Sequence, residues 1–142
     1  MKFSEIGRDE WDALKPYLDT VLLPLSGLTG GEQPWEAVEA LEKVRDALDP
    51  LESAFKGRVV TYPALHYAED DNALAQLADE ICKRLYEAGF AYCIIVAGDE
   101  RLTGLPFHQA SAVIGPDREE DLKRPGAYVE RARRTVENLW RT

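Results

Sequence analysis

Four polar side chains that follow predicted strands could do chemistry: Thr29, His66, Tyr67 and Asp99. The Asp99 carboxylate can accept a proton or a hydroxyl group from a ligand, and the Tyr67 ring offers a flat face with a polar tip. His66 is poised to titrate near neutral pH, so that a His66/Asp99 pair could serve as acid and base. Loop histidines are more often exposed or hydrogen-bonded locally. The four residues are therefore predicted to bind a ligand, and no catalytic residue is assigned.

The placement of this site rests on a rule for open parallel sheets, in which ligands bind beyond the carboxyl ends of the strands. Pro63 turns the chain away from the sheet just before His66 and Tyr67. Four segments follow predicted strands, namely 26–31, 63–67, 98–100 and 115–118. If a small-molecule site exists, we expect it where these segments converge.

The glycine-rich loop 26–34 invites a phosphate-binding interpretation, because glycines let backbone N–H groups approach an anion. The loop lacks the lysine of a G-x-x-x-x-G-K-[ST] motif and does not match G-x-G-x-x-G. Glu32 adds a repelling charge. A surface turn is the favoured interpretation.

The sequence also contains no motif for metal binding or for acyl transfer. His66 and His108 lie far apart and show no metal-ligand spacing. Ser26 and Ser111 lack the G-x-S-x-G elbow of a nucleophilic serine. No metal and no cofactor are predicted.

Four apolar segments must position the site residues, and they are predicted as strands over 20–25, 58–62, 91–97 and 109–115. The first could also be the tail of a helix, although its short, continuously apolar and β-branched character favours a strand ending near Pro24. The last has the weakest pattern.

Helical periodicity separates these strands. One predicted helical face consists of Trp35, Val38, Leu41, Val44 and Leu48. Asp49-Pro50 then predicts a stop and a second short helix with Asp49 as its N-cap. A clearer stripe follows the cap region 70–72, ends before Gly89 and consists of Leu74, Leu77, Ala78, Ile81, Cys82 and Leu85. The last helix, after Pro125-Gly126, has an apolar stripe of Val129, Ala132, Val136, Leu139 and Trp140.

Apolar strands that alternate with helices favour parallel pairing through right-handed crossovers. We predict one α/β domain over residues 1–142, a small three-layer α/β/α sandwich with a mostly parallel sheet of about four strands. The pattern does not give the strand order. Five side chains are expected to be fully buried: Val59, Ile81, Leu85, Ile94 and Val96.

Composition narrows the possible functions. The 142 residues carry a net charge of −9, which argues against a general nucleic-acid binder because such proteins need a surplus of Lys and Arg. No stretch is apolar enough for membrane insertion, and residues 1–9 have mixed charge without an apolar segment. We expect a cytoplasmic protein.

Cys82 and Cys93 fall inside apolar patterns and have no C-x-x-C spacing. Buried free thiols are the favoured interpretation, because a free cysteine packs as a small hydrophobe. A Cys82–Cys93 disulfide or a reactive thiol is the alternative.

Charge is uneven along the chain. From Pro116 onward seven Lys and Arg face six Asp and Glu, so the acidic excess lies upstream. The final predicted helix and its end carry Arg131, Arg133, Arg134 and Arg141. These arginines could dock an acidic protein partner, whereas the alternative is a solvated helix surface. The oligomeric state cannot be read from the sequence.

Three segments together carry a resemblance to a known family: 17–25, 55–67, and 89–99 with its Gly-Phe start and Ala-Gly-Asp end. The arrangement resembles the YpiF-like family of small uncharacterised proteins from Gram-positive, spore-forming bacteria. The resemblance implies no activity, cofactor or catalytic residue. It suggests a cytosolic accessory protein linked to a respiratory quinol–cytochrome complex. His66 departs from the hydroxyl residue more usual there, so the resemblance gives it no catalytic support.

Two classes of function remain open. The first is a non-catalytic accessory or protein-binding module, favoured by the uneven charge and the lack of a catalytic motif. The second is a small-molecule-binding or enzymatic domain with its site at the strand ends. A crevice at those ends would favour the second class, and a flat apolar patch would favour the first.

Overall fold

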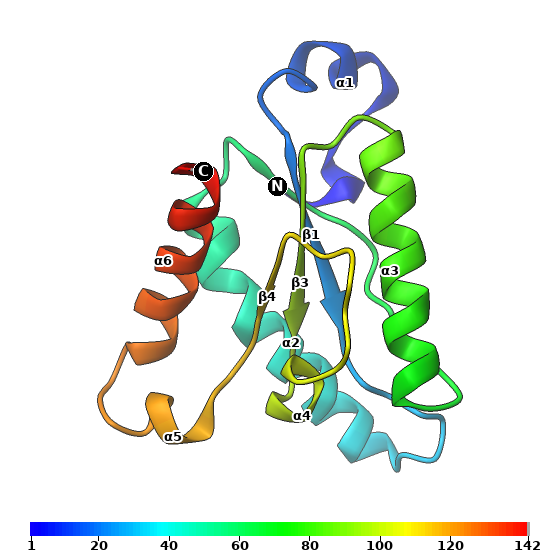
Figure 1. Ribbon diagram of the computed structural model, residues 1–142, viewed down its shortest axis with the longest axis vertical. Helices are drawn as coiled ribbons and strands as arrows, with labels where there is room; N and C mark the ends of the chain where they lie inside the picture. The colour runs from blue at the N-terminus through cyan, green and yellow to red at the C-terminus, as the bar shows by residue number, and fades with distance from the viewer. Residues whose placement is uncertain (142) are drawn as a thin grey trace.

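Four parallel strands form the centre of the molecule, as seen in a computed structural model that describes residues 1–141 (Figure 1). The strands are β1 (Thr20–Leu25), β2 (Val59–Thr61), β3 (Tyr92–Ala97) and β4 (Ala112–Ile114). Their order across the sheet is β2-β1-β3-β4, and every pair is parallel. The predicted α/β sandwich with a sheet of about four strands is confirmed.

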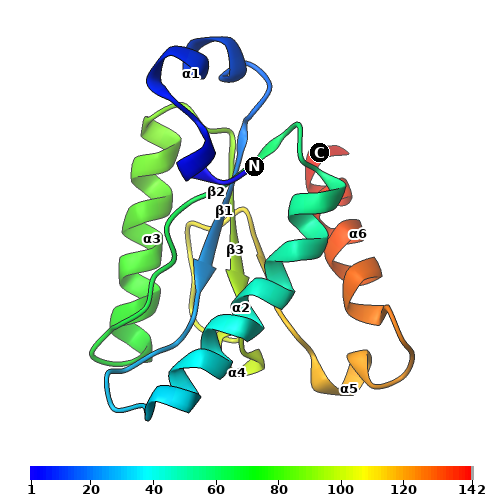
Figure 2. The same cartoon turned by 180° about the vertical axis from the view of Figure 1, so that it is seen from behind.

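Helices cover both faces of this sheet (Figures 1 and 2). Helices α2 (Pro34–Ala54) and α6 (Ala127–Arg141) pack on one face, and α3 (Asp71–Glu87) packs on the other. Helix α1 (Arg8–Leu14) and the 3-10 turn η1 (Phe3–Glu5) lie near the amino ends of the strands. Two short helices follow β3 and β4, namely α4 (Glu100–Thr103) and α5 (Arg118–Asp121). Within residues 1–141, no helix is both long and apolar enough to cross a membrane.

The two central strands explain why the sequence reads as continuous apolar runs. In β3, Cys93 and Ile95 contact the α3 side, whereas Ile94 and Val96 contact the side of α2 and α6. All four side chains are fully buried. Strands covered on both faces have no polar side, so their pattern does not alternate.

Pro24 sits inside β1 although proline cannot donate a ladder hydrogen bond. The Pro24 carbonyl accepts from the backbone N–H of Leu65, on the side where β2 has already ended. A residue's N–H and C=O point to the same side of a strand, so the missing donor does not interrupt pairing with β3.

Helix α2 differs from the prediction at Asp49-Pro50. It runs through Asp49-Pro50 without a break, so the predicted stop and restart there are wrong. Leu48 and Leu51 are buried on either side of the proline, and this packing outweighs one lost helical hydrogen bond.

The predicted apolar face of α2 is also only partly correct. Val44 and Leu48 are buried, whereas Trp35, Val38 and Leu41 are 63%, 53% and 45% exposed. The first half of α2 extends beyond the carboxyl ends of the strands, where no sheet lies beneath it (Figure 2).

Other burial predictions need smaller corrections. Val59, Leu85, Ile94 and Val96 are buried as expected, but Ile81 is only partly buried. Two further stripe residues, Leu77 on α3 and Val129 on α6, are exposed. Leu77 lies at the margin of its stripe, where the helix surface turns away from the sheet.

Cys82 on α3 and Cys93 on β3 face each other inside the core. Their Sγ atoms are 3.0 Å apart, both residues are fully buried, and both are free thiols. The contact with Cys82, together with burial, raises the pKa of the Cys93 thiol above its ordinary value. The buried free thiols predicted from the sequence are confirmed.

We expect native Cys82 and Cys93 to react slowly with a water-soluble thiol reagent, because neither sulfur reaches solvent. Both should react rapidly in denaturant. A timed thiol titration under the two conditions measures this difference. Rapid labelling of either cysteine in the native protein would contradict the core placement.

Candidate functional site

The strand order creates a crevice at one point of the sheet. The chain passes from β1 to β2 on one side and then returns to β3 on the other side of β1. The loops after β1 and β3 therefore leave in opposite directions, which is the arrangement at which open α/β sheets bind ligands. The segments at this point are Ser26-Gly27 after β1 and Gly98-Asp99 after β3.

Two adjoining hollows lie here beneath α2, and they share Lys43, Gly98 and Asp99. The larger hollow has a volume of about 520 Å³ and extends toward α5 and α6. The smaller has a volume of about 230 Å³ and extends toward the loop after β1. Together they form the strand-end crevice, and the larger one falls in the size range of small-molecule sites.

Gly98 determines how closely α2 approaches β3. A Cβ atom at this position would lie 2.7 Å from Val44 Cγ2 and 3.0 Å from the Val44 backbone nitrogen. Only glycine fits this approach without a shift of the helix. The close crossing places Lys43, the residue before Val44, above the end of β3.

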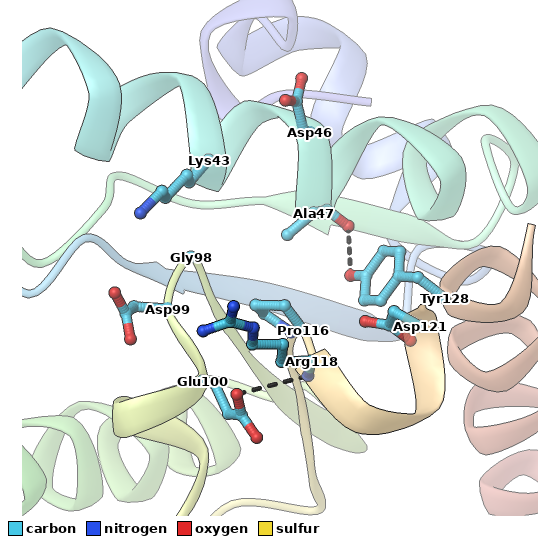
Figure 3. A pocket seen from close by; sticks show the side chains of 10 residues that line it. All are labelled: Lys43, Asp46, Ala47, Gly98, Asp99, Glu100, Pro116, Arg118, Asp121 and Tyr128. Atoms are coloured by element: carbon cyan, nitrogen blue, oxygen red, sulfur yellow. Dashed lines mark hydrogen bonds between the residues drawn. The ribbon is translucent and has the colours of Figure 1, made fainter. Parts of the chain in front are cut away.

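Side chains from several elements line the larger hollow, as Figure 3 shows. They are Lys43, Asp46 and Ala47 of α2, Gly98, Asp99 and Glu100 after β3, and Pro116, Arg118, Asp121 and Tyr128 after β4. The set combines three apolar or aromatic groups with six charged ones, and it is suited to a polar organic ligand.

Tyr128 forms a fixed wall of the hollow. Its hydroxyl donates to the Ala47 carbonyl at 2.7 Å, which joins α6 to α2 (Figure 3). Burial raises the pKa of Tyr128 well above its ordinary value, so the phenol stays protonated at neutral pH. Its single proton is already donated, and the ring face is what remains for a ligand.

Arg131 holds the segment after β4 in place. Its guanidinium pairs with the Asp121 carboxylate and donates to the Gly115 carbonyl at 2.7 Å. The hydrogen bond from Arg131 lowers the pKa of Asp121. Asp121 is therefore ionised and already paired, and Arg131 is not a free cation of the last helix.

Lys43 and Arg118 differ from Arg131, because their side chains have no hydrogen bond or ion pair within residues 1–141. Asp99 is the N-cap of α4 and accepts from the Arg101 backbone N–H at 2.9 Å. Glu100 accepts from the Arg118 backbone N–H at 3.3 Å. The larger hollow thus holds two unpaired cations beside two carboxylates that bind only backbone.

The Glu32 side chain forms hydrogen bonds with other residues of the glycine-rich loop. The Glu32 carboxylate accepts from the backbone N–H of Thr29 at 2.6 Å and of Gly30 at 2.8 Å. The Thr29 hydroxyl donates to it as well, at 2.9 Å. A carboxylate therefore occupies the N–H groups that a phosphate would use, which agrees with the predicted surface turn.

These hydrogen bonds, the one from the Thr29 backbone foremost, lower the pKa of Glu32 from 4.5 to about 2. Because the folded pKa is below the ordinary one, we expect the contacts to stabilise the loop fully above about pH 4.5 and to be lost as pH falls through about 2. NMR titration of the Thr29 and Gly30 amide shifts measures this midpoint. A midpoint near 4.5 would show that the carboxylate is not bound by the loop.

Of the four site residues predicted from the sequence, only Asp99 lines the two hollows. His66 is linked to them indirectly, because its Nδ1 lies 2.8 Å from the Oγ of Ser26, a lining residue of the smaller hollow. Thr29 binds Glu32, which lines that hollow too. Tyr67 is exposed and lies beside His66. A ligand site made of all four residues stays a prediction.

Sequence reasoning did not select Lys43, Arg118 or Tyr128. Arg118 lies in the segment after the fourth predicted strand, and this position could have indicated that it belongs to the site. Lys43 and Tyr128 lie on helices, and their approach to the strand ends depends on how α2 and α6 cross the sheet.

Within residues 1–141, no group of three or more His, Cys, Asp and Glu side chains is arranged to hold a metal ion.

The fold and the crevice define a small parallel α/β domain with a ligand-sized hollow at the turning point of its sheet. Residues 9–107 match the model of a family described as "Protein of unknown function (DUF2487)", and the chain belongs to this family. Neither the curated proteins nor the solved structures contain a match. An uncharacterised family is thus confirmed, whereas the YpiF-like name and the bacterial group stay predictions.

Proposed function

We propose that this domain binds a small polar molecule in the strand-end crevice. The observation that carries the proposal is the pair of unpaired cations, Lys43 and Arg118, in a hollow of about 520 Å³ at the turning point of the sheet. An unpaired charged side chain in a concave site can form strong hydrogen bonds with an oppositely charged group of a ligand.

Protein-observed NMR tests this proposal. A library of small metabolites of positive, negative, zwitterionic and neutral charge is added to the labelled protein. Binding in the crevice is expected to shift the backbone amides of Gly98, Asp99, Glu100 and Arg118. An Arg84→Gln variant, changed on the exposed surface of α3, should respond as the wild type does. Shifts confined to other surfaces, or none from any compound, would overturn the proposal.

A second candidate function is docking of an acidic protein partner through α6, as an accessory protein would require. Arg133 and Arg134 are exposed and form no ion pair within residues 1–141. They form a smaller cationic surface than the sequence suggested, since Arg131 is engaged inside the fold. The link to a respiratory quinol–cytochrome complex rests on the family resemblance alone.

A matched pair of double variants tests this docking surface. We expect Arg133→Glu with Arg134→Glu to abolish the interaction with any acidic partner identified by pull-down. Lys83→Glu with Arg84→Glu changes the same charge on exposed α3 positions and should retain the partner. Equal loss in both variants would show that net charge, rather than α6, determines binding.

A further inference from the structure

The strand-end crevice presents both signs of charge to one space. Figure 3 shows the Lys43 amine and the Arg118 guanidinium directed into the hollow, with the carboxylates of Asp99 and Glu100 beside it. The two cations have no partner within residues 1–141. Within residues 1–141, each carboxylate accepts one backbone hydrogen bond, at 2.9 Å for Asp99 and 3.3 Å for Glu100. A carboxylate has about four acceptor positions, so both can accept further donors.

A ligand of a single charge fits this arrangement poorly. An anion bound to Arg118 would also lie near Asp99 and Glu100, where like charges repel it. A cation bound to these carboxylates would meet Lys43 and Arg118 in the same way. A ligand that carries one group of each sign satisfies both sets.

We infer that the ligand is a zwitterionic α-amino compound, such as an amino acid; this inference rests on the proposed binding function. Its carboxylate binds Arg118 and Lys43, because the planar guanidinium matches a carboxylate through two parallel hydrogen bonds. Its ammonium group donates to Asp99 and Glu100. The ligand is neutral overall, which suits a protein of net charge −9.

An apolar wall completes the site and receives the ligand side chain. Ala47, Pro116 and the ring of Tyr128 line the hollow, and the Tyr128 hydroxyl is fixed to the Ala47 carbonyl at 2.7 Å. An aromatic ring held in one orientation offers a flat apolar face without further loss of side-chain freedom. The volume of about 520 Å³ leaves room for a side chain as large as a phenyl group.

Matched sets of probes test the charge requirement. L-phenylalanine is compared with phenethylamine, which lacks the carboxylate, and with 3-phenylpropanoate, which lacks the ammonium group. L-leucine is compared in the same way with 3-methylbutylamine and 4-methylpentanoate. Binding constants come from calorimetry, and the amides of residues 98–100 and 118 report the place of binding. We expect at least one amino acid to bind, and each of its single-charge analogues to bind at least tenfold more weakly.

Two variants test which side chain binds which charged group of the ligand. Arg118→Gln is expected to weaken amino-acid binding at least tenfold but to change phenethylamine binding less than threefold. Asp99→Asn should show the opposite selectivity, with 3-phenylpropanoate least affected. Asparagine can still cap α4, so this variant keeps the local fold. Arg84→Gln on the exposed surface of α3 is the matched control and should bind as the wild type does.

The possible outcomes separate the inference from the proposed function. Equal or tighter binding of a single-charge analogue overturns the zwitterionic assignment. If both amino acids leave the crevice amides unshifted while another class of compound shifts them, the inference fails and the proposed function stands. If no compound shifts those amides, both fail.

Discussion

Replacing Ile94 with alanine is expected to lower the free energy of unfolding by about 2–5 kcal/mol. Ile94 is fully buried in β3, where it pairs in register with Leu22 of β1 and Ala112 of β4. It packs in the core cluster formed by the four strands, α2 and α6. The substitution removes buried apolar surface and leaves a cavity that neighbours on a rigid sheet fill only in part. Urea denaturation followed by circular dichroism gives the change.

Leu41→Ala is the matched control for this prediction. Leu41 lies on α2 but is 45% exposed, so that its truncation should change stability by less than about 1 kcal/mol. A loss below about 1 kcal/mol for Ile94→Ala would mean that the centre of the sheet is not packed as described.

The central strands could be predicted because they are buried on both faces. Residues such as Val21, Ile94 and Val96 contact helices on either side, so their segments are apolar throughout. The strand order could not be predicted, since no local pattern records which strand lies beside which. Pro50 shows a second limit, because burial of Leu48 and Leu51 overrides a local signal to stop a helix.

The candidate site was predictable only where it follows the strands directly. Asp99 comes immediately after Gly98 at the end of β3, and its place in the crevice follows from the parallel sheet. Lys43 and Tyr128 reach the crevice through the crossing of α2 and the return of α6, which are long-range features. The predicted His66/Asp99 pair is not formed in the structure, where the hydrogen bond of the His66 ring is to Ser26, a lining residue of the smaller hollow.

Trp140 anchors the last helix to the amino end of the sheet. Its indole N–H donates to the Thr20 hydroxyl at 3.0 Å. Its ring packs edge-on against the Phe55 ring, with 4.9 Å between the ring centroids. The Arg58 guanidinium lies 4.0 Å above the ring centroid and also binds the Asp19 carboxylate at 2.9 Å and 3.1 Å. One side chain therefore joins α6 to β1 and to the segment that precedes β2.

We expect Trp140→Ala to lower the free energy of unfolding by about 2–4 kcal/mol, because it removes the ring contact, the cation–π contact and the hydrogen bond together. Trp140→Phe keeps an aromatic ring against Phe55 and Arg58 and loses only the indole N–H, so its cost should be about 0.5–1.5 kcal/mol. The Thr20 hydroxyl keeps its bond to Asp19 at 2.9 Å in both variants. Urea denaturation followed by circular dichroism measures the difference. Equal losses in the two variants would show that the hydrogen bond, rather than the ring, fastens α6 to the sheet.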